Sequence, residues 1–419
     1  MKVLRAGFFD SSWSNSAFRF HPSSFPRVPL AVPYWNGETY RAILRSLLSG
    51  AVVEGPDFQR LQSAVLGALG VENAALCGSG SLAIEIALRA CGVGRGDEVI
   101  IPTFCCTAVV PPVLAVGAVP VLADVGAELN ITAETVDAAL TKKTKAVIVP
   151  HLFGNPAEID GIVDLTRGRN IRVIDDAAQA LGATIDGRPV GSFGDAGILS
   201  FGSEKICSGL GGGVVVMGNS EALNGGTKID LPAARLFPSL RALFFTLISR
   251  RWRRWSLPLL SRMSASGPDA VPAPYRIESM ANLNAAVAVS LMQTLSENIA
   301  ARRARVDAYR ELLGTEKGLA LIPHRRGSAC LTQVVRVLPA RRGEDSASEI
   351  VQALCRAGYE VQGSYVPIHA LSGYQQFVRR YLPHAERVWS DLIELPCEPD
   401  VSFAHVERIA AVLKQVLSR

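Results

Sequence analysis

A lysine stands inside a glycine-rich loop at residues 200–213, which read SFGSEKICSGLGGG. One short apolar run, residues 196–199, precedes the loop, and a second, residues 214–217, follows it. Two apolar runs joined by glycines predict two strands whose connection holds Lys205 close to packed backbone. A lysine in such a place can lose its proton and attack an aldehyde as an amine nucleophile. A solvated lysine on a flexible loop is the alternative, so the meaning of this loop depends on the rest of the chain.

The size and composition of the chain indicate a folded globular protein. Its 419 residues are 48% hydrophobic and 19% charged, enough for a full core in two lobes. The net charge of +5 is too small and too scattered to indicate nucleic-acid binding. The eight cysteines lack metal-ligand spacing, so we expect reduced thiols, a cytoplasmic protein and no metal site. Neither an apolar signal core at residues 1–10 nor a run of 18 apolar residues occurs, so neither secretion nor a membrane span is expected.

Short apolar runs alternate with helical stretches between residues 73 and 217. Near-continuous apolar strands separated by helices predict an α/β fold with a mostly parallel seven-stranded sheet, covered on both faces. The order of elements after residue 299 predicts a smaller C-terminal α/β domain. We therefore expect an N-terminal arm (1–27), a large domain (28–298) and a small domain (299–419). The predicted strands of the large sheet cover residues 74–77, 98–101, 119–122, 146–149, 171–174, 196–201 and 213–217.

Two of the predicted strands end in motifs that suit an anionic, aromatic ligand. Ligands of parallel sheets gather at the carboxyl ends of the strands. Residues 77–81 read CGSGS before a helix, so the backbone amides and hydroxyl around Gly80 and Ser81 suit a phosphate group. Residues 174–179 read IDDAAQ. Either carboxylate, Asp175 or Asp176, can cap a helix, and one of them can pair with a protonated pyridine nitrogen.

Two further strand ends carry candidates with open alternatives. Phe104, within PTFCCT at residues 102–107, can stack on a planar ring or pack in the core. His151, within PHLFGN at residues 150–155, can line the site or be a buried structural histidine.

Three residues on separate strand ends form one chemical set. Ser81 lies in a phosphate pocket, Asp176 offers a carboxylate to a ring nitrogen, and Lys205 offers an amine to an aldehyde. Pyridoxal 5′-phosphate (PLP) requires these three groups. Because the combination is far more specific than any member, it favours PLP as the cofactor and Lys205 as the residue that binds it.

These motifs resemble those of the fold-type I PLP enzymes of the DegT/StrS group, the sugar-nucleotide aminotransferases. The resemblance runs from about residue 28 to the end of the chain. It implies that Asp176 pairs with the pyridine nitrogen, that Gln179 lies near the ring oxygen and that Ser200 binds the phosphate. The matching motifs read SGSLAI at 79–84, PVLAD at 120–124, NI at 130–131, HLFG at 151–154, DDAAQ at 175–179, SFGSEK at 200–205, YVPIH at 365–369 and LP at 395–396.

The resemblance also implies an activity. We expect a homodimeric, PLP-dependent aminotransferase with Lys205 as its catalytic residue. Glutamate is the expected amino donor, and a nucleotide-linked keto-deoxysugar of amino-sugar or polysaccharide biosynthesis is the expected acceptor. The loop of Tyr365 and His369 is expected to fold back toward the cofactor, where His369 contacts substrate or stays on the surface.

Three departures from the family pattern motivate other functions. Cys106 stands where many members place the aromatic that stacks on the cofactor, so a thiol or Phe104 takes that place. Gly211 replaces a glutamate, and Ser279 lies in an altered segment that in the family reaches the partner subunit's site. A regulatory or catalytically weak PLP-binding relative is therefore one alternative. A sugar dehydratase is another, although such members carry a histidine at the position of Lys205.

Residues 231–274 form an insertion with an unusual composition. Its apolar part reads LFPSLRALFFTLI at residues 236–248, and RRWRRW follows at residues 250–255. The apolar part is too short to span a bilayer. An apolar helix followed by arginines and tryptophans suits the surface of an anionic membrane. Residues 236–255 are therefore expected either to contact a membrane peripherally or to pack on the large domain or a partner subunit.

Overall fold

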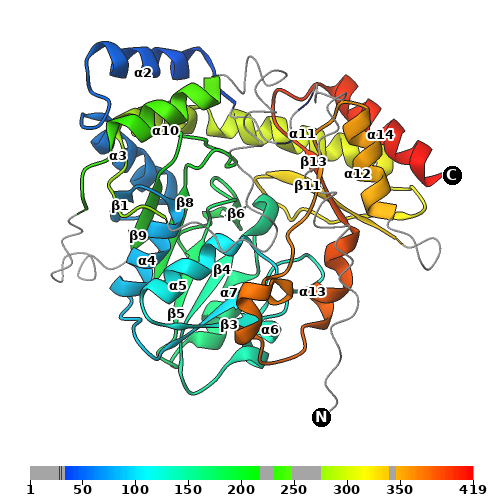
Figure 1. Ribbon diagram of the computed structural model, residues 1–419, viewed down its shortest axis with the longest axis horizontal. Helices are drawn as coiled ribbons and strands as arrows, with labels where there is room; N and C mark the ends of the chain where they lie inside the picture. Colours follow the sequence, from blue (N-terminus) through cyan, green and yellow to red (C-terminus); the bar gives the residue numbers. More distant parts are fainter. Residues whose placement is uncertain are drawn as a thin grey trace.

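Two β-sheets organise the chain in the computed structural model, which describes residues 28, 30, 34–217, 231–247, 275–338 and 346–418. The larger sheet has seven strands in the order β1-β9-β8-β5-β4-β2-β3, and helices cover both of its faces (Figure 1). A four-stranded sheet in the order β10-β11-β13-β12 lies beside it. The predicted α/β fold is confirmed. The predicted arm, residues 1–27, lies outside the described residues.

The larger sheet is parallel except at β9. This strand pairs antiparallel with β1 and with β8, because the lysine loop returns the chain directly beside the strand that it has just left. The remaining neighbours all pair parallel. The strands are β1 (Asn73–Cys77), β2 (Glu98–Pro102), β3 (Val119–Ala123), β4 (Thr144–Pro150), β5 (Arg172–Asp176), β8 (Ala196–Ser200) and β9 (Gly213–Met217), and a separate hairpin has β6 (Thr184–Ile185) and β7 (Arg188–Pro189).

Alternate residues of the central strands pack against different helices. Val99 and Ile101 of β2 belong to the apolar cluster of α4 and α5, whereas Ile100 belongs to that of α6 and α7. This two-residue period explains why the strands read as continuous apolar runs, since both faces are buried. The helices around the larger sheet are α2 (Gly37–Leu48), α3 (Asp57–Leu69), α4 (Gly80–Ala90), α5 (Val110–Ala115), α6 (Ala133–Ala139), α7 (Ile159–Thr166) and α10 (Asn282–Gln293).

The smaller sheet has its own apolar core beneath α11, α12 and α14. α11 runs through the domain limit predicted after residue 298, and the domain limits stay a prediction. The buried Arg302 of α11 forms an ion pair with Glu398 and donates to Asn298 Oδ1 (2.7 Å) and to Leu331 O (3.0 Å), which compensates its burial. The elements are α11 (Leu295–Leu313), β10 (Leu319–Leu321), β11 (Thr332–Val337), α12 (Ser346–Arg356), β12 (Gln362–Gly363), α13 (Pro383–Val388), β13 (Leu392–Pro396) and α14 (Phe403–Leu417).

A backbone contact at Gly154 joins the two sheets. Gly154 O accepts hydrogen bonds from Ala329 N (2.8 Å) and from the Ser328 hydroxyl (2.7 Å). The glycine has φ +77°, and a Cβ atom there would lie 2.6 Å from Leu331 N. Only glycine therefore allows this loop of the active-site edge to lie so close to the smaller sheet.

We expect Gly154→Ala to lower the free energy of unfolding by about 2 kcal/mol or more, because the new methyl group collides with fixed backbone. Gly168→Ala is the matched control: its φ is +75°, but a Cβ atom would meet nothing within 4 Å. The control should lose only about 1 kcal/mol, the cost of a left-handed L-residue. Urea denaturation of both variants measures the difference, and equal losses would contradict the assigned close contact.

Candidate active site

A cavity of about 230 Å³ opens at the carboxyl ends of β1, β4, β5 and β8, around Lys205. Most of the sequence-predicted site residues meet on its lining, although they come from distant parts of the chain. Phe104, Tyr365 and His369 do not line it. The predicted residues on the lining are Gly80, Ser81, Cys106, His151, Asp176, Gln179, Ser200 and Lys205.

The phosphate turn is the N-terminus of α4. Ser79 has an extended backbone, and its hydroxyl caps the helix by accepting from Leu82 N at 3.1 Å. A Cβ atom at Gly80 would lie 3.0 Å from Ser200 Oγ, so the glycine lets the turn approach the end of β8 closely. Backbone amides of a first helical turn lack intrahelical partners and bind anions. The turn and Ser200 therefore fit a phosphate group.

The two adjacent aspartates have different environments. Asp175 is fully buried, and its Oδ1 accepts from His151 Nε2 at 2.6 Å. Its Oδ2 accepts from Gly191 N (2.7 Å) and from Phe193 N (2.9 Å). Both carboxylate oxygens are thus used within the protein, and Asp175 ties β4 and β5 to the loop after β7.

Asp176 instead faces the cavity. Its side chain accepts a hydrogen bond from Ala178 N (3.0 Å) and has an exposed fraction of 4%. Burial raises the pKa of this carboxyl group, while the Ala178 hydrogen bond and the charge of Lys205 oppose the increase. A carboxylate in such a place gains most from a cationic partner, which a protonated pyridine nitrogen supplies. Of the two aspartates, Asp176 fits the ring.

His151 lines the cavity, but its ring nitrogens are both occupied. Nδ1 accepts a hydrogen bond from Ala157 N at 2.8 Å, so Nε2 carries the ring proton and donates it to Asp175. The structure therefore places His151 as the partner of Asp175, and neither nitrogen is available to a substrate.

Phe104 and Cys106 diverge although they are two residues apart. The Phe104 ring is completely buried and packs against Phe153 and Tyr365, with ring centroids 6.3 and 6.0 Å away. Cys106 reaches the cavity lining. The structure thus puts the Cys106 side of this stretch at the cavity and Phe104 in the core.

Tyr365 and His369 do not line the cavity, but each makes a hydrogen bond to a residue near it. The Tyr365 hydroxyl accepts from Gln179 Nε2 at 3.0 Å, while Gln179 Oε1 accepts from Phe153 N at 3.0 Å, so Gln179 is held from both sides. His369 Nδ1 lies 2.7 Å from Thr103 Oγ1, which anchors this loop to the end of β2. The sequence did not predict a role for Thr103. Its place at the end of a strand was the only feature that could have indicated one.

Gly211 and Ser279, the two other positions that differ from the family pattern, lie close to the phosphate turn. Gly211 has φ +119°, a conformation that side chains rarely adopt. Ser279 closes the base of the insertion, since its amide donates to Pro232 O (2.8 Å) and its hydroxyl accepts from Ala234 N (3.0 Å). Its neighbour Glu278 accepts from Gly78 N through its backbone oxygen (2.9 Å), so the insertion begins and ends beside the phosphate turn.

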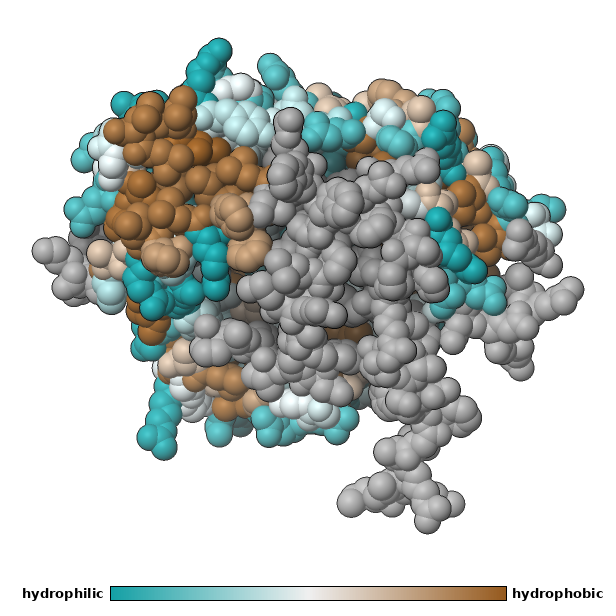
Figure 2. Space-filling model, turned by 45° about the horizontal axis from the view of Figure 1, so that its top comes forward, coloured by the Kyte–Doolittle hydropathy of each residue, from teal (hydrophilic) through white to brown (hydrophobic). Residues whose placement is uncertain are grey.

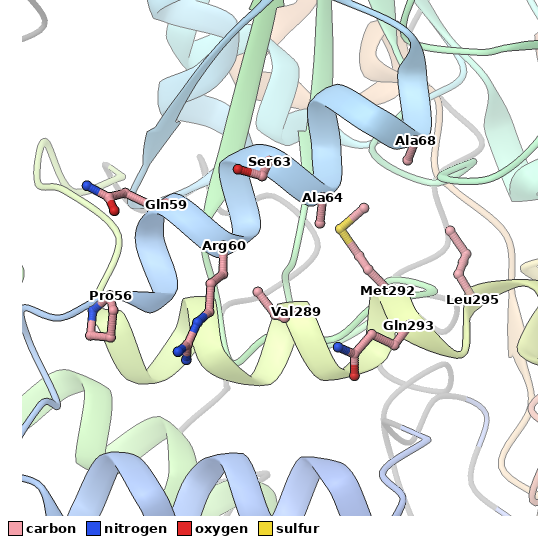
Figure 3. A pocket seen from close by; sticks show the side chains of 10 residues that line it. All are labelled: Pro56, Gln59, Arg60, Ser63, Ala64, Ala68, Val289, Met292, Gln293 and Leu295. Atoms are coloured by element: carbon pink, nitrogen blue, oxygen red, sulfur yellow. The ribbon is translucent and has the colours of Figure 1, made fainter.

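A larger hollow of about 590 Å³ lies between α3 and α10 (Figure 3). Small and apolar side chains form much of its lining, and its one charged residue, Arg60, already pairs with Asp57 at 2.9 Å. This hollow brings together no catalytic set, so the smaller cavity around Lys205 is the candidate active site. Among the described residues, no group of three or more His, Cys, Asp or Glu side chains could hold a metal ion.

Comparison with known families tests the resemblance found in the sequence. The model of the DegT/DnrJ/EryC1/StrS aminotransferase family matches residues 34–231 and 274–414. The chain belongs to this family. The resemblance found in the sequence is confirmed, and the unmatched residues 232–273 coincide with the predicted insertion. No helix within the described ranges is long and apolar enough to cross a membrane.

Relatives of known activity include two sugar-nucleotide aminotransferases. GDP-perosamine synthase of Caulobacter vibrioides is 28% identical over 94% of this chain and 100% of its own length. UDP-N-acetyl-3-dehydro-alpha-D-glucosamine 3-aminotransferase of Acidithiobacillus ferrooxidans is 42% identical over 44% of this chain and 50% of its own length.

Solved structures share the fold. The aminotransferase TlmJ of Streptoalloteichus hindustanus matches with a TM-score of 0.77 and 25% identity, covering 93% of this chain and 99% of its own. The E. coli GDP-4-keto-6-deoxy-D-mannose-3-dehydratase with bound hydrated PLP matches with a TM-score of 0.75 and 20% identity, covering 93% and 100%. The second of these likenesses supports the fold alone.

Neutralising Asp175 and neutralising Asp176 should have different effects on the free energy of unfolding. Asp175→Asn should lower the free energy of unfolding of the cofactor-free protein by about 2 kcal/mol, because an amide cannot satisfy all three donors. Asp176→Asn should leave it unchanged or raise it at pH 8. The raised pKa of Asp176 means that its ionised form costs stability as pH rises, and the variant removes that cost. Denaturation by urea at pH 8 compares them, and a larger loss in Asp176→Asn would contradict these roles.

Proposed function

We propose that this enzyme transfers an amino group from glutamate to a nucleotide-linked keto-deoxysugar with PLP as its cofactor. The observation that carries the proposal is the meeting of Lys205, Asp176 and the N-terminus of α4 on one cavity. The names of the two relatives support a keto-sugar nucleotide as the acceptor, since both describe amino-sugar chemistry on a nucleotide-linked sugar. Amino-sugar biosynthesis is the corresponding process.

The cavity residues divide the work of holding the cofactor. Gly80, Ser81 and Ser200 would bind its phosphate, and Asp176 would hold a proton on the ring nitrogen. When bound, PLP supplies an aldehyde for the amine and a ring that accepts electrons from the substrate carbon. Gln179, fixed by Phe153 N and Tyr365, is placed to donate toward the ring's own oxygen.

Lys205 has two tasks in this scheme. Its Nζ is the amine nucleophile that would hold the cofactor through the cofactor's aldehyde. As a free amine, Nζ would take the proton from the Cα of the amino donor as a general base, hold it, and release it as a general acid. The same nitrogen returns the proton when the sugar receives the amino group.

Lys205→Ala should abolish the visible absorbance of covalently bound PLP, whereas Lys317→Ala, an exposed lysine far along the chain, should retain it. Glutamate should bleach that absorbance in the wild type and leave 2-oxoglutarate. A visible spectrum combined with keto-acid detection measures both. If the wild type binds PLP but glutamate leaves the spectrum unchanged, the chain is a binding or regulatory relative rather than an aminotransferase.

We further propose a homodimer in which the partner completes the site. The substrates carry diphosphate and carboxylate groups, yet Lys205 is the only cation on the cavity lining among the described residues. A surface for the contact is formed by α2 and the helical residues 236–247. Figure 2 shows apolar side chains gathered on the face that carries α2. The exposed apolar residues of the two helices are Tyr40, Leu44, Leu47, Leu48, Leu236, Phe237, Phe244 and Leu247.

Peripheral membrane contact through residues 236–255 competes for the same surface. Phe237, with an exposed fraction of 85%, and Phe244, with 59%, support either contact. Residues 248–255, with the arginine–tryptophan run, lie outside the described residues. The two proposals differ in what buries these side chains, and one pair of variants separates them.

Leu44→Glu with Phe237→Glu should halve the molar mass measured by light scattering, because each charge faces the partner. Tyr381→Glu, which alters another exposed aromatic (75%), should leave the mass unchanged. Sedimentation with phosphatidylglycerol vesicles tests the competing contact. An unchanged mass together with lost vesicle binding in the double variant would replace the dimer contact by the membrane contact.

A further inference from the structure

A cationic groove lies at the edge of the large sheet opposite the active site. The loops that enter β2, β4 and β5 enclose a hollow of about 440 Å³. Parallel strands present their amino ends at this edge and their carboxyl ends at Lys205, so the groove shares no residue with the cofactor cavity. The charged residues on its lining are Arg95, Asp97, Lys142, Lys143, Lys145 and Arg169.

Most of the cations that line the groove have no ion pair within the described part of the chain, although neighbouring arginines do. On the same loops, Arg167 pairs with Asp164 at 2.8 Å and Arg172 with Asp195 at 2.7 Å. Neither Arg167 nor Arg172 lines the groove. Inside it, Arg169 alone has an ion pair with a described carboxylate, at the longer distance of 3.7 Å from Asp137.

The nearby carboxylates neutralise the groove only in part, because, among the described residues, Asp97 is the one carboxylate on a lining that carries five cations. Asp97 Oδ2 accepts from Gly94 N at 2.9 Å, within its own turn. Glu98 is buried below the surface, where Arg379 Nη1 (2.6 Å) and the Thr141 hydroxyl occupy its oxygens. The four cations without an ion pair, Arg95, Lys142, Lys143 and Lys145, therefore concentrate positive charge in a chain whose net charge is only +5.

The backbone beneath these cations is ordered by hydrogen bonds. Glu98 N donates to Lys143 O at 2.9 Å, and Thr141 N donates to Thr144 Oγ1 at 2.9 Å. Gly96 N donates to Gly117 O at 3.2 Å, which ties the loop of Arg95 to the turn before β3. Like charges on a fixed, concave surface repel one another, and a multivalent anion relieves that repulsion.

We propose that this groove binds a compact anion with two or more phosphate groups. Several lysine and arginine donors on separate loops suit phosphate oxygens that point in several directions. The cations come from three separate loops around a volume of about 440 Å³, which suits a compact diphosphate that contacts several of them at once. The groove thus gives the enzyme a second anion site, separate from its chemistry.

Titration of the PLP-loaded protein with inorganic pyrophosphate tests the proposal, since bound cofactor keeps the phosphate turn of the active site filled. Calorimetry should find pyrophosphate binding, and the two variant pairs distinguish the groove from the diphosphate site of the substrate in the active site. Lys142→Glu with Lys143→Glu should weaken the dissociation constant at least tenfold. Arg387→Glu with Arg408→Glu is the matched control, because both arginines are exposed, lie outside the groove and give the same change in charge. The control should bind within about twofold of the wild type, and both pairs should keep the wild-type melting temperature.

The other outcomes overturn the groove as a diphosphate site. Equal weakening in both variant pairs would show a response to net charge alone. Absence of pyrophosphate binding at low salt would also reject it. Binding of phosphatidylglycerol vesicles, lost in the Lys142→Glu/Lys143→Glu variant but without any pyrophosphate binding, would assign the cations to a membrane surface instead.

Discussion

The buried carboxylate of Asp175 is the constraint on which the active-site edge depends. A charge without solvent is tolerated only when hydrogen-bond donors surround it. His151 Nε2 and the amides of Gly191 and Phe193 supply them, and these donors come from two separate segments, the residue after β4 and the loop after β7. One carboxylate therefore fixes the ends of β4 and β5 and the loop after β7. Because Asp175 is satisfied, its neighbour Asp176 is left to face the cavity.

Residues outside the cavity lining hold the lining residues in place through hydrogen bonds. Gln179 is held by the Tyr365 hydroxyl and by Phe153 N, and the loop of Tyr365 is tied to β2 through His369 and Thr103. Gly154 links the same edge to the smaller sheet. Residues of both sheets therefore determine where the cofactor-facing groups lie. A substitution in the smaller sheet would therefore alter the cavity through these hydrogen bonds and not by contacting it directly.

The insertion explains one departure from the family pattern. Residues 232–273 are absent from the match to the family model, and Ser279 uses its amide and hydroxyl to close their base. A small polar side chain suits that close backbone contact. The insertion exposes Phe237 and Phe244 next to the surface of α2, far from the cationic groove. The chain thus presents an apolar surface and a charged surface in addition to its catalytic cavity.

The sequence by itself determined the sheet, the cofactor and the family. Apolar runs with helices between them predict a parallel sheet, and Ser81, Asp176 and Lys205 stand at the ends of separate runs, where that topology brings them together. Tertiary structure alone decided that Asp175 is bound within the protein while Asp176 faces the cavity, why His151 is unavailable to substrate, and that Cys106 rather than Phe104 reaches the cavity. Those outcomes depend on side-chain partners distant in sequence, and adjacent residues on a strand end point to opposite sides.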